Sequence, residues 1–321
     1  MSNPMLRRLL LLGCLFGASV PALADQSPET LLKRMAATMH TVNYEGLLLH
    51  VQGNETRTMR IFHLYDAVHG ERERVLSMDG PAREVLHEGD RCTCVWPRAR
   101  LVVSGQTPAW RGQFSTDRFA ETGQLAEHYG FVKEGQARVA SLGCQVVKLA
   151  PKDDLRHGYR LCIHEPSAML LRLEVLDGEN RRLEMNQFAS LRVMPDLDQD
   201  LMRLATDTSG FRVIEEAGNI HPHQPAWIAR TLPAGYKLHV AAERNNPRTG
   251  RMLEHLIFTD GLSSVSVFIE SMPDNPPSHT EFIGAMHRVT RDVDGYRLTA
   301  IGEAPVAAMR MIIDGLQPAA R

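Results

Sequence analysis

The sequence predicts an α+β protein in which most strands belong to antiparallel sheets. Three observations carry this prediction: an apolar helical stripe near the N-terminus, many short β-rich segments separated by turn residues, and a second helical stripe near the C-terminal end. Because short turns such as Asp-Gly join antiparallel neighbours, we expect the β-rich segments to form hairpins. A chain of 321 residues is long enough for two domains.

The N-terminal segment has the pattern of a secretory signal peptide, which we expect to span residues 1–24. Arg7 and Arg8 precede an apolar run over residues 9–20, and Ala-Leu-Ala at residues 22–24 suits a cleavage site. The alternative is a lipoprotein signal ending at Cys14, but cutting there would leave an unusually short apolar region. No later segment has the roughly 20 consecutive apolar residues of a membrane span. We therefore expect an exported, soluble mature protein.

The first helix begins at Ser27, which can cap it, followed by Pro28 in the first turn. Its apolar face consists of Leu31, Leu32, Met35 and Met39. Short β-rich segments then fill residues 44–103, including 47–51 and 59–65, with hairpin turn signals at 53–54, 79–80 and 88–90. A second helix is expected over residues 116–128, ended by Gly130, and further strands at 131–140, 144–150, 159–163, 169–176 and 182–193.

The domain boundary is expected in a segment poor in periodic apolar residues. After a short helix over 195–206, residues 207–225 mix Gly, Pro, His and Asn, and we interpret them as a linker. The first domain then covers residues 25–206 and the second covers 226–321. In the second domain we expect strands at 227–240, within 252–269 and at 296–301, a loop at 273–277, and a closing helix over 305–314 stopped by Gly315.

The usual local signatures of enzymes are missing, so the sequence favours a binding protein without a cofactor. It contains no G-x-S-x-G, H-E-x-x-H or Walker motif. The Asp-Thr-Ser-Gly stretch at residues 207–210 differs from the aspartic protease loop in the place of its glycine. His221 and His223 have no nearby carboxylate or thiolate to complete a metal site. A net charge of -2 argues against nucleic acid as a partner.

Four cysteines remain after removal of the signal peptide. Cys144 and Cys162 lie on adjacent predicted strands, so we expect a disulfide between them. Cys92 and Cys94 are two apart on a strand and point the same way, and could offer two sulfurs to copper or zinc. The simpler interpretation is that both pack as small core residues, and we expect no metal site.

Apolar residues are concentrated in the first domain, which suggests a helix lying against a curved sheet. This layer could be a closed core, or it could enclose a cavity with adaptable side chains that binds an acyl chain. The residues of this candidate lipid-binding set are Leu31, Met35, Met39, Leu47, Leu49, Val51, Met59 and Ile61.

Several stretches resemble one known family in order and spacing. In the first domain they are residues 44–46 (Tyr-Glu-Gly), 74–80 with 83–85, and 129–131 leading to 137–140. In the second they are Trp227 with 232–236 (Leu-Pro-Ala-Gly-Tyr), 260–270, and 302–305 (Gly-Glu-Ala-Pro). Over nearly its whole length the mature chain resembles the RseB/MucB family of periplasmic regulators of the envelope-stress sigma factor.

The resemblance implies an N-terminal antiparallel half-barrel with helices, similar to the lipoprotein carriers LolA and LolB, and a smaller α+β C-terminal domain. It implies a negative regulator that binds the periplasmic segment of a membrane anti-sigma factor, of the RseA or MucA type, and shields it from the site-1 protease. Lipid, lipopolysaccharide or lipoprotein acyl chains would relieve the shielding. The Cys92 and Cys94 pair is not a recognised feature of the family.

We expect the C-terminal domain to contact the partner, since edge strands and aromatic anchors suit capture of a flexible peptide. Deleting the chain from Gln224 onward should then abolish binding, whereas a lipid or lipoprotein carrier, the main alternative, would not need this domain. A hydrolase is a third alternative that an acyl-ester assay would exclude, and a homodimer is left open. The expected partner-binding residues are Leu232, Pro233, Gly235, Tyr236, Leu262, Val265 and Phe268.

Overall fold

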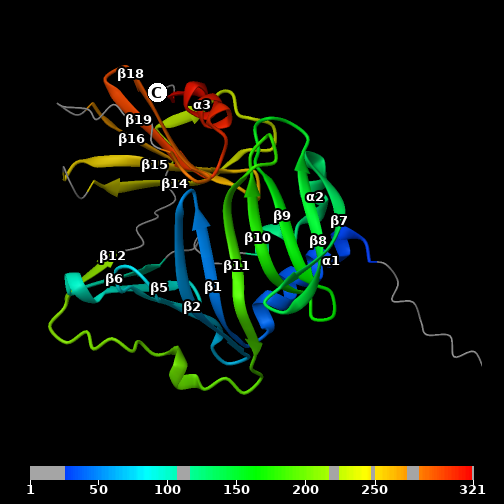
Figure 1. Ribbon diagram of the computed structural model, residues 1–321. Coiled ribbons are helices and arrows are strands. Elements are labelled where there is room, and N and C mark those ends of the chain that lie inside the picture. Colours follow the sequence, from blue (N-terminus) through cyan, green and yellow to red (C-terminus); the bar gives the residue numbers. More distant parts are fainter. Residues whose placement is uncertain (1–25, 107–115, 217–223, 247–249, 273–281, 320–321) are drawn as a thin grey trace, which may run out of the picture.

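The computed structural model describes residues 26–106, 116–216, 224–246, 250–272 and 282–319 (Figure 1). The expected signal peptide, the His221 and His223 pair and the loop at 273–277 lie outside these ranges. Strands dominate the fold, as the sequence predicts, and a large open sheet and a smaller sheet carry the helices. Among the described residues, none of the helices is long and apolar enough to cross a membrane.

The large sheet has twelve strands in the order β12-β6-β5-β4-β3-β2-β1-β11-β10-β9-β8-β7. Neighbours pair antiparallel, with the exception of β12 and β6, which pair in parallel. Figure 1 shows that the sheet curves. Helix α1 (Pro28–Thr41) lies against it near β7 and β10. The strands are β1 (Tyr44–Gln52), β2 (Glu55–Asp66), β3 (Gly70–Ser77), β4 (Glu84–Glu88), β5 (Arg91–Trp96), β6 (Leu101–Gln106), β7 (Tyr129–Val139), β8 (Leu142–Pro151), β9 (Gly158–His164), β10 (Met169–Leu176), β11 (Arg182–Val193) and β12 (Arg212–Glu216).

The first helix begins where the sequence predicts. The Ser27 hydroxyl accepts a hydrogen bond from the Thr30 amide, and Pro28 occupies the first turn, where its missing N–H costs nothing. The second expected helix is shorter than predicted. A 3-10 turn, η2 (Asp117–Phe119), comes first, and α2 (Thr122–His128) starts only after Glu121, whose backbone leaves the helical region.

One expectation about the boundary segment is wrong, and one strand there is additional to those expected. The helix expected over residues 195–206 is only a short 3-10 turn, η3 (Gln199–Met202). The expected linker contains β12, which extends the large sheet at its β6 edge. The edge of a sheet offers unpaired backbone groups, and these satisfy the linker backbone although the linker has little apolar periodicity.

The second domain contains a six-stranded sheet in the order β14-β15-β16-β19-β18-β17 and one main helix, α3 (Val306–Gly315). The strand expected over 227–240 is broken, because the chain turns at Gly235 in a positive-φ conformation. A strand that the sequence does not predict, β18, lies just before residue 296. The elements are β13 (Trp227–Ala229), β14 (Lys237–Asn245), β15 (Met252–Thr259), β16 (Ser264–Ser271), β17 (Phe282–Ile283), β18 (Met286–Val293), β19 (Tyr296–Gly302) and β20 (Leu316–Pro318).

The hydrophobic cores of the two domains meet. The core of the first domain includes Leu262 and Ala285 from the second domain. Conversely, Leu155 of the first domain packs against the core formed by α3 and the small sheet. The contact between the domains, which we call the domain joint, is therefore partly apolar.

Candidate functional site

The candidate lipid-binding set is divided between two faces of the large sheet. Paired residues on neighbouring strands share a face, and Leu48 pairs with Met59 while Gly46 pairs with Ile61. This is the inner face, which shares one core with α1. Leu47, Leu49 and Val51 alternate with these residues and lie on the outer face. The sequence shows that alternate residues differ, but it does not show which ones meet the helix.

On the inner face the set forms a packed core. Leu31, Met35 and Ile61 are completely buried and Met39 is 3% exposed. Met59 is half-buried at the margin of this core. A ligand entering between α1 and the sheet would have to displace these contacts, because protein cores are close-packed.

The C-terminal end of α1 is held to the sheet by a charged cluster. Nδ1 of His40 lies 2.6 Å from the carboxylate of Glu71 on β3, and Nε2 contacts the carboxylate of Asp117 in η2. Hydrogen bonds to Asp117 and then Glu71 raise the pKa of His40 to about 10, so the imidazole is charged at neutral pH.

The same cluster reaches the buried residue His63. Its Nε2 lies 3.1 Å from Glu71, its Nδ1 lies 2.8 Å from the backbone oxygen of Val42, and its ring stacks on Tyr44. Burial acts to raise the pKa of Glu71, but hydrogen bonds from His40 and His63 hold it down at about 2. Both carboxylates and both histidines thus act together to fasten α1.

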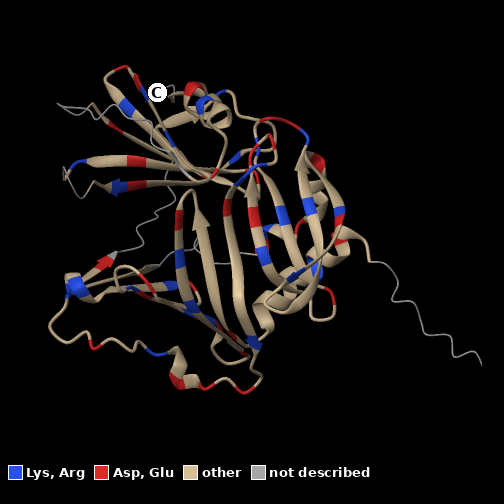
Figure 2. Cartoon of the chain, viewed as in Figure 1, with Lys and Arg blue, Asp and Glu red and all other residues tan. Residues whose placement is uncertain are grey.

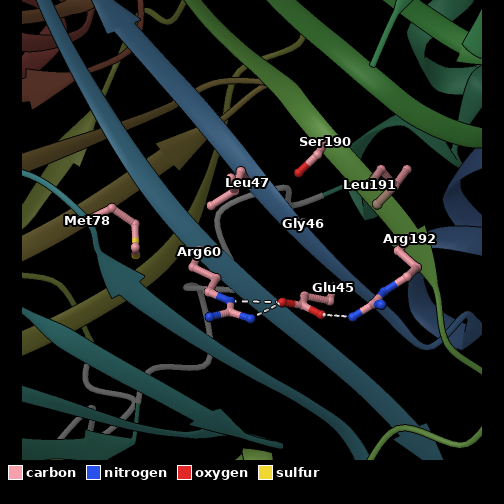
Figure 3. Close-up of a pocket in the computed structure, with 8 residues that line it drawn as sticks. All are labelled: Glu45, Gly46, Leu47, Arg60, Met78, Ser190, Leu191 and Arg192. Atoms are coloured by element: carbon pink, nitrogen blue, oxygen red, sulfur yellow. Dashed lines mark hydrogen bonds and ion pairs between the residues drawn. The ribbon is translucent and has the colours of Figure 1, made fainter. Parts of the chain in front are cut away.

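A cavity of about 430 Å³ opens on the outer face of β1, β2 and β11 (Figure 3). Glu45 lies between Arg60 and Arg192, and these two hydrogen bonds keep the pKa of its carboxyl below the usual range. Apolar side chains complete the wall, so the surface is amphipathic with its charges paired. The lining residues are Glu45, Gly46, Leu47, Arg60, Met78, Ser190, Leu191 and Arg192. Only Leu47 belongs to the candidate lipid-binding set.

Charges of both signs are interspersed along the chain (Figure 2). On β7 to β10, Arg160 lies 2.6 Å from Glu134 and 3.3 Å from Glu174, while Arg172 lies 3.7 Å from Glu174. This part of the outer face is therefore a charge-paired surface without a large field of either sign.

A second cavity, of about 500 Å³, lies at the domain joint. Residues 150–157 and the turn at 177–180 form one side, and His287, Pro305 and Val306 of the second domain form the other. The ring centroids of His157 and His287 are 5.8 Å apart. Burial, and then the nearby His287, lower the pKa of His157 to about 4, so it is neutral at neutral pH.

A buried ion pair joins the domains beside this cavity. Nε of Arg156 lies 3.0 Å from Oδ2 of Asp260, and neither side chain is exposed. The Arg156 guanidinium also donates to the backbone oxygen of Ala234 and lies 5.7 Å from the ring centre of Tyr236. Oδ1 of Asp260 accepts from the amides of its own turn, at Leu262 and Ser263.

Most of the expected partner-binding set lies at this joint or in the core of the second domain. Pro233 is buried, Tyr236 is 5% exposed, Leu262 is 3% exposed and Val265 is completely buried. A side chain at Gly235 would collide with His128 and Arg156. Tyr236 and Leu262, which lie at the joint, could reach a partner only if the domains separate, whereas Val265 belongs to the core of the second domain.

Two members of the set remain partly accessible. Leu232 is half-buried, and so is Phe268, whose ring stacks on His255 with centroids 4.3 Å apart. Phe268 lies on the face of the small sheet opposite α3, because its neighbours Val267 and Ile269 pack with α3. Its strand β16 lies between β15 and β19, so the expectation of an edge strand here is wrong.

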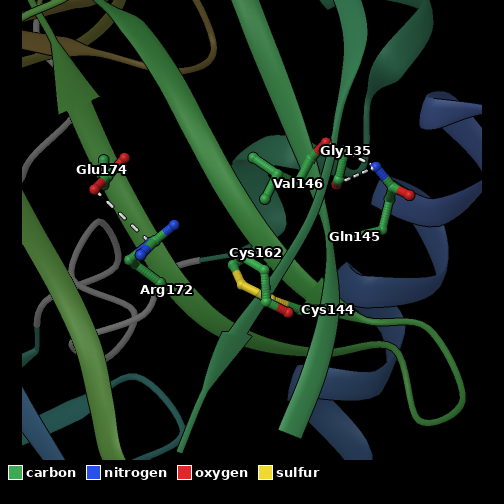
Figure 4. The surroundings of a disulfide bond; sticks show 8 residues. Gly135, Cys144, Gln145, Val146, Cys162, Arg172 and Glu174 are labelled. Carbon is green, nitrogen blue, oxygen red and sulfur yellow. Dashed lines mark hydrogen bonds and ion pairs between the residues drawn. A yellow bond between two sulfur atoms is a disulfide. The ribbon is translucent and has the colours of Figure 1, made fainter.

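The structure joins Cys144 on β8 to Cys162 on β9 by a disulfide (Figure 4). Their Cα atoms are 5.4 Å apart, and both residues are buried. The bond joins two neighbouring strands on the outer face, the side of Lys148 and Arg160, because these cysteines alternate with the inner core residues Val147 and Leu161.

We expect this disulfide in the purified protein, and expect the Cys144→Ser, Cys162→Ser double variant to lose about 3 kcal/mol of unfolding free energy. The loss arises because a cross-link over 18 residues restricts the unfolded chain. Peptide mapping without reduction should find the two peptides linked. Alkylation of both cysteines in unreduced protein would contradict the prediction.

The chain is similar in sequence to known regulators of sigma factors. Residues 27–206 match the family model described as MucB/RseB N-terminal domain, and residues 221–317 match the MucB/RseB C-terminal domain. The chain is 25% identical to the sigma factor AlgU regulatory protein MucB of Pseudomonas aeruginosa, over 97% of each chain. It is 23% identical to the sigma-E factor regulatory protein RseB of Escherichia coli K12, over 93% of each.

Solved structures show a similar fold. A crystal structure of MucB in complex with MucA(peri) matches with a TM-score of 0.73 and 23% identity, over 92% of this chain and 100% of that one. The complex of MucA and MucB from Pseudomonas aeruginosa matches with a TM-score of 0.73 and 22% identity, over 92% and 99%.

Proposed function

This chain belongs to the MucB/RseB family, and on that premise we propose that it is a negative regulator that binds the periplasmic segment of a membrane anti-sigma factor. The observation that carries the proposal is that both domain models match in order across the chain. Its relatives are named as regulators of sigma factors, and one is solved with MucA. Binding would shield the partner from site-1 proteolysis, and the mature chain would act in the periplasm after loss of residues 1–24. A regulator of this kind needs no catalytic centre.

We further propose the domain limits 25–206 and 226–321, with residues 207–225 between them. The pairing of β12 with β6 supports a boundary segment that is fastened to the first domain. The Arg156 to Asp260 pair and the apolar joint favour the closed arrangement of the two domains.

The partner would bind first to the accessible part of the expected contact set, which includes Phe268. In the full-length mature chain, Phe268→Ala should weaken binding of the MucA- or RseA-type periplasmic segment about tenfold or more, as truncation of an aromatic anchor does. The affinity is measured by calorimetry, and protection of the segment against site-1 protease in parallel.

The matched control is Phe211→Ala. Phe211 is also half-buried and its ring lies against Arg100, but it lies in the boundary segment, directly before β12, which pairs with the first domain. It should bind as wild type does. Wild-type affinity in Phe268→Ala would place the partner elsewhere, and absence of binding by the wild-type chain would reject the proposed function itself.

Lipid sensing would use the inner face of the large sheet, in a half-barrel similar to LolA and LolB. The inner-face core supports this proposal, because α1 covers it and is held at one end by a charged cluster that could open. Each methylene moved from water into such a core contributes roughly 0.8 kcal/mol. A chain of ten or so carbons could therefore offset the displaced contacts and supply the roughly 1 to 3 kcal/mol of a typical allosteric coupling.

Filling the margin of this core tests the lipid site. Met59→Trp should block release of the partner by acyl lipid while leaving partner binding intact, because Met59 is half-buried on the inner face. Met35→Trp is a poorer choice, since Met35 is completely buried and a larger side chain would strain the core.

Leu47→Trp, on the outer face, is the control for an equal change in size. It should respond to lipid as wild type does. If Leu47→Trp blocks release and Met59→Trp does not, the lipid binds at the outer-face cavity.

A further inference from the structure

Cys92 and Cys94 form a pair of thiols that neither the disulfide nor the proposed function uses. Both lie on β5, and their sulfur atoms are 3.8 Å apart. Cys92 is buried, at 6% exposed, whereas Cys94 is half-buried and can be reached from the surface. Two sulfurs thus converge at the margin of the inner face.

The strand keeps these sulfurs from forming a disulfide easily. Alternate residues of a strand are separated by about 6.6 Å, close to the upper limit of about 6.8 Å for Cα atoms joined by a disulfide. β5 is hydrogen-bonded to β4 on one side and β6 on the other, so it cannot shorten without loss of pairing. An ion can bridge the two sulfurs without bending the strand. Two thiolates bind a soft d10 cation in a nearly linear arrangement, so rotation of the cysteine side chains would widen the present 3.8 Å between the sulfurs without changing the backbone.

The surroundings favour negative charge on the sulfurs. Nη2 of Arg83 lies 3.6 Å from Sγ of Cys94, and the same guanidinium lies 5.4 Å from the ring centre of Trp96. His87 is the residue opposite Cys92 on β4. The Arg83 guanidinium therefore lies beside Cys94, and the His87 imidazole lies beside Cys92.

We propose that Cys92 and Cys94 bind one soft monovalent cation, Cu(I) or its analogue Ag(I). Binding replaces two S–H bonds with two S–Cu bonds and releases two protons, and the guanidinium of Arg83 balances the single negative charge of the product. Soft thiolate ligands select Cu(I). Among the described residues no three or more His, Cys, Asp or Glu side chains converge as a metal site, so the four ligands that Zn²⁺ prefers are not assembled.

The experiment is an anaerobic competition of the mature chain with a chromophoric Cu(I) chelator, bathocuproine disulfonate. Wild type should remove one equivalent of Cu(I) and gain sulfur-to-copper absorption in the ultraviolet. Cys92→Ser and Cys94→Ser should each weaken binding about 100-fold or more, because a second ligand on the same strand acts at high effective concentration. Ag(I) should quench Trp96 fluorescence in wild type and not in Cys94→Ser.

Thr93→Ala is the matched control, since Thr93 lies between the cysteines but on the opposite face, where its hydroxyl contacts Ser104. It should bind Cu(I) as wild type does. Thermal melting of each variant confirms that it is folded. Equal Cu(I) affinity in the Cys92→Ser, Cys94→Ser double variant, tighter binding of Zn²⁺ than of Cu(I), or a mass that shows a second disulfide would each overturn the proposal. None of these outcomes depends on partner binding.

Discussion

Asp260→Asn should destabilise the protein by about 2–3 kcal/mol, because the buried Arg156 guanidinium then keeps only Asp153, which is 33% exposed, as a counter-charge. The substitution isolates the charge. Asn keeps an oxygen that can accept from the turn amides of Leu262 and Ser263, as Oδ1 of Asp260 does. It replaces Oδ2, which faces Arg156, with an NH₂ group that cannot accept. The loss is measured as the change in unfolding free energy in urea.

Asp200→Asn provides the control for removal of one carboxylate. Asp200 lies 3.3 Å from Arg203, but both side chains are more than two-thirds exposed, so water screens the pair. We expect little change in its urea midpoint. Equal midpoints for Asp260→Asn and wild type would show that the joint does not depend on this ion pair.

The same variant links the joint to function. If partner binding needs residues now buried at the joint, such as Tyr236 and Leu262, a weaker joint makes them available more often. Asp260→Asn should then bind the partner more tightly than wild type, at temperatures where both are folded. Weaker binding would indicate that the closed arrangement is the one that the partner recognises.

His40→Gln should remove on the order of 3 kcal/mol of unfolding free energy at pH 7, where the charged imidazole bridges Glu71 and Asp117. This figure is smaller than the pKa change alone would give, because Glu71 is 44% exposed and its interaction is screened. Glutamine can still donate a hydrogen bond, so the variant removes mainly the charge. The result is measured by urea unfolding.

The pH dependence identifies the cause. The pKa of His40 rises from 6.5 to about 10 on folding, so the folded protein binds a proton more tightly than the unfolded chain. The stabilisation is fully present below pH 6.5 and is lost as the pH rises through about 10. Wild type and His40→Gln should therefore differ most below pH 7 and converge near pH 10.5. Other groups that titrate in this range affect both proteins and cancel in the difference.

His69→Gln is the matched control, since His69 contacts Asp66 at 3.0 Å but is 59% exposed. Its urea midpoint should stay close to that of wild type across this range. A constant gap between wild type and His40→Gln up to pH 10.5 would contradict the role of the charged imidazole. In the proposed regulator, His40→Gln should also lower the lipid concentration needed for release, because α1 loses one of its attachments.

Features that depend on neighbours along the chain can be predicted from local sequence. Ser27 and Pro28 start the first helix, because a cap and a first-turn proline act within one turn. The turn at residues 79–80 lies between β3 and β4, as its composition predicts. The family followed from short stretches in a conserved order along this chain, and the matched domain models confirm it.

Tertiary structure decided whatever depends on residues distant in sequence. Alternation along β1 separates Leu47 from Leu48, but only pairing with β2 and contact with α1 make Leu48 the inner residue. Likewise, the sequence of residues 232–236 suggests an exposed anchor, but Arg156, from a loop of the other domain, lies against them. The local pattern of a strand indicates that its two sides differ. Long-range packing determines which side is buried and which charged residues pair.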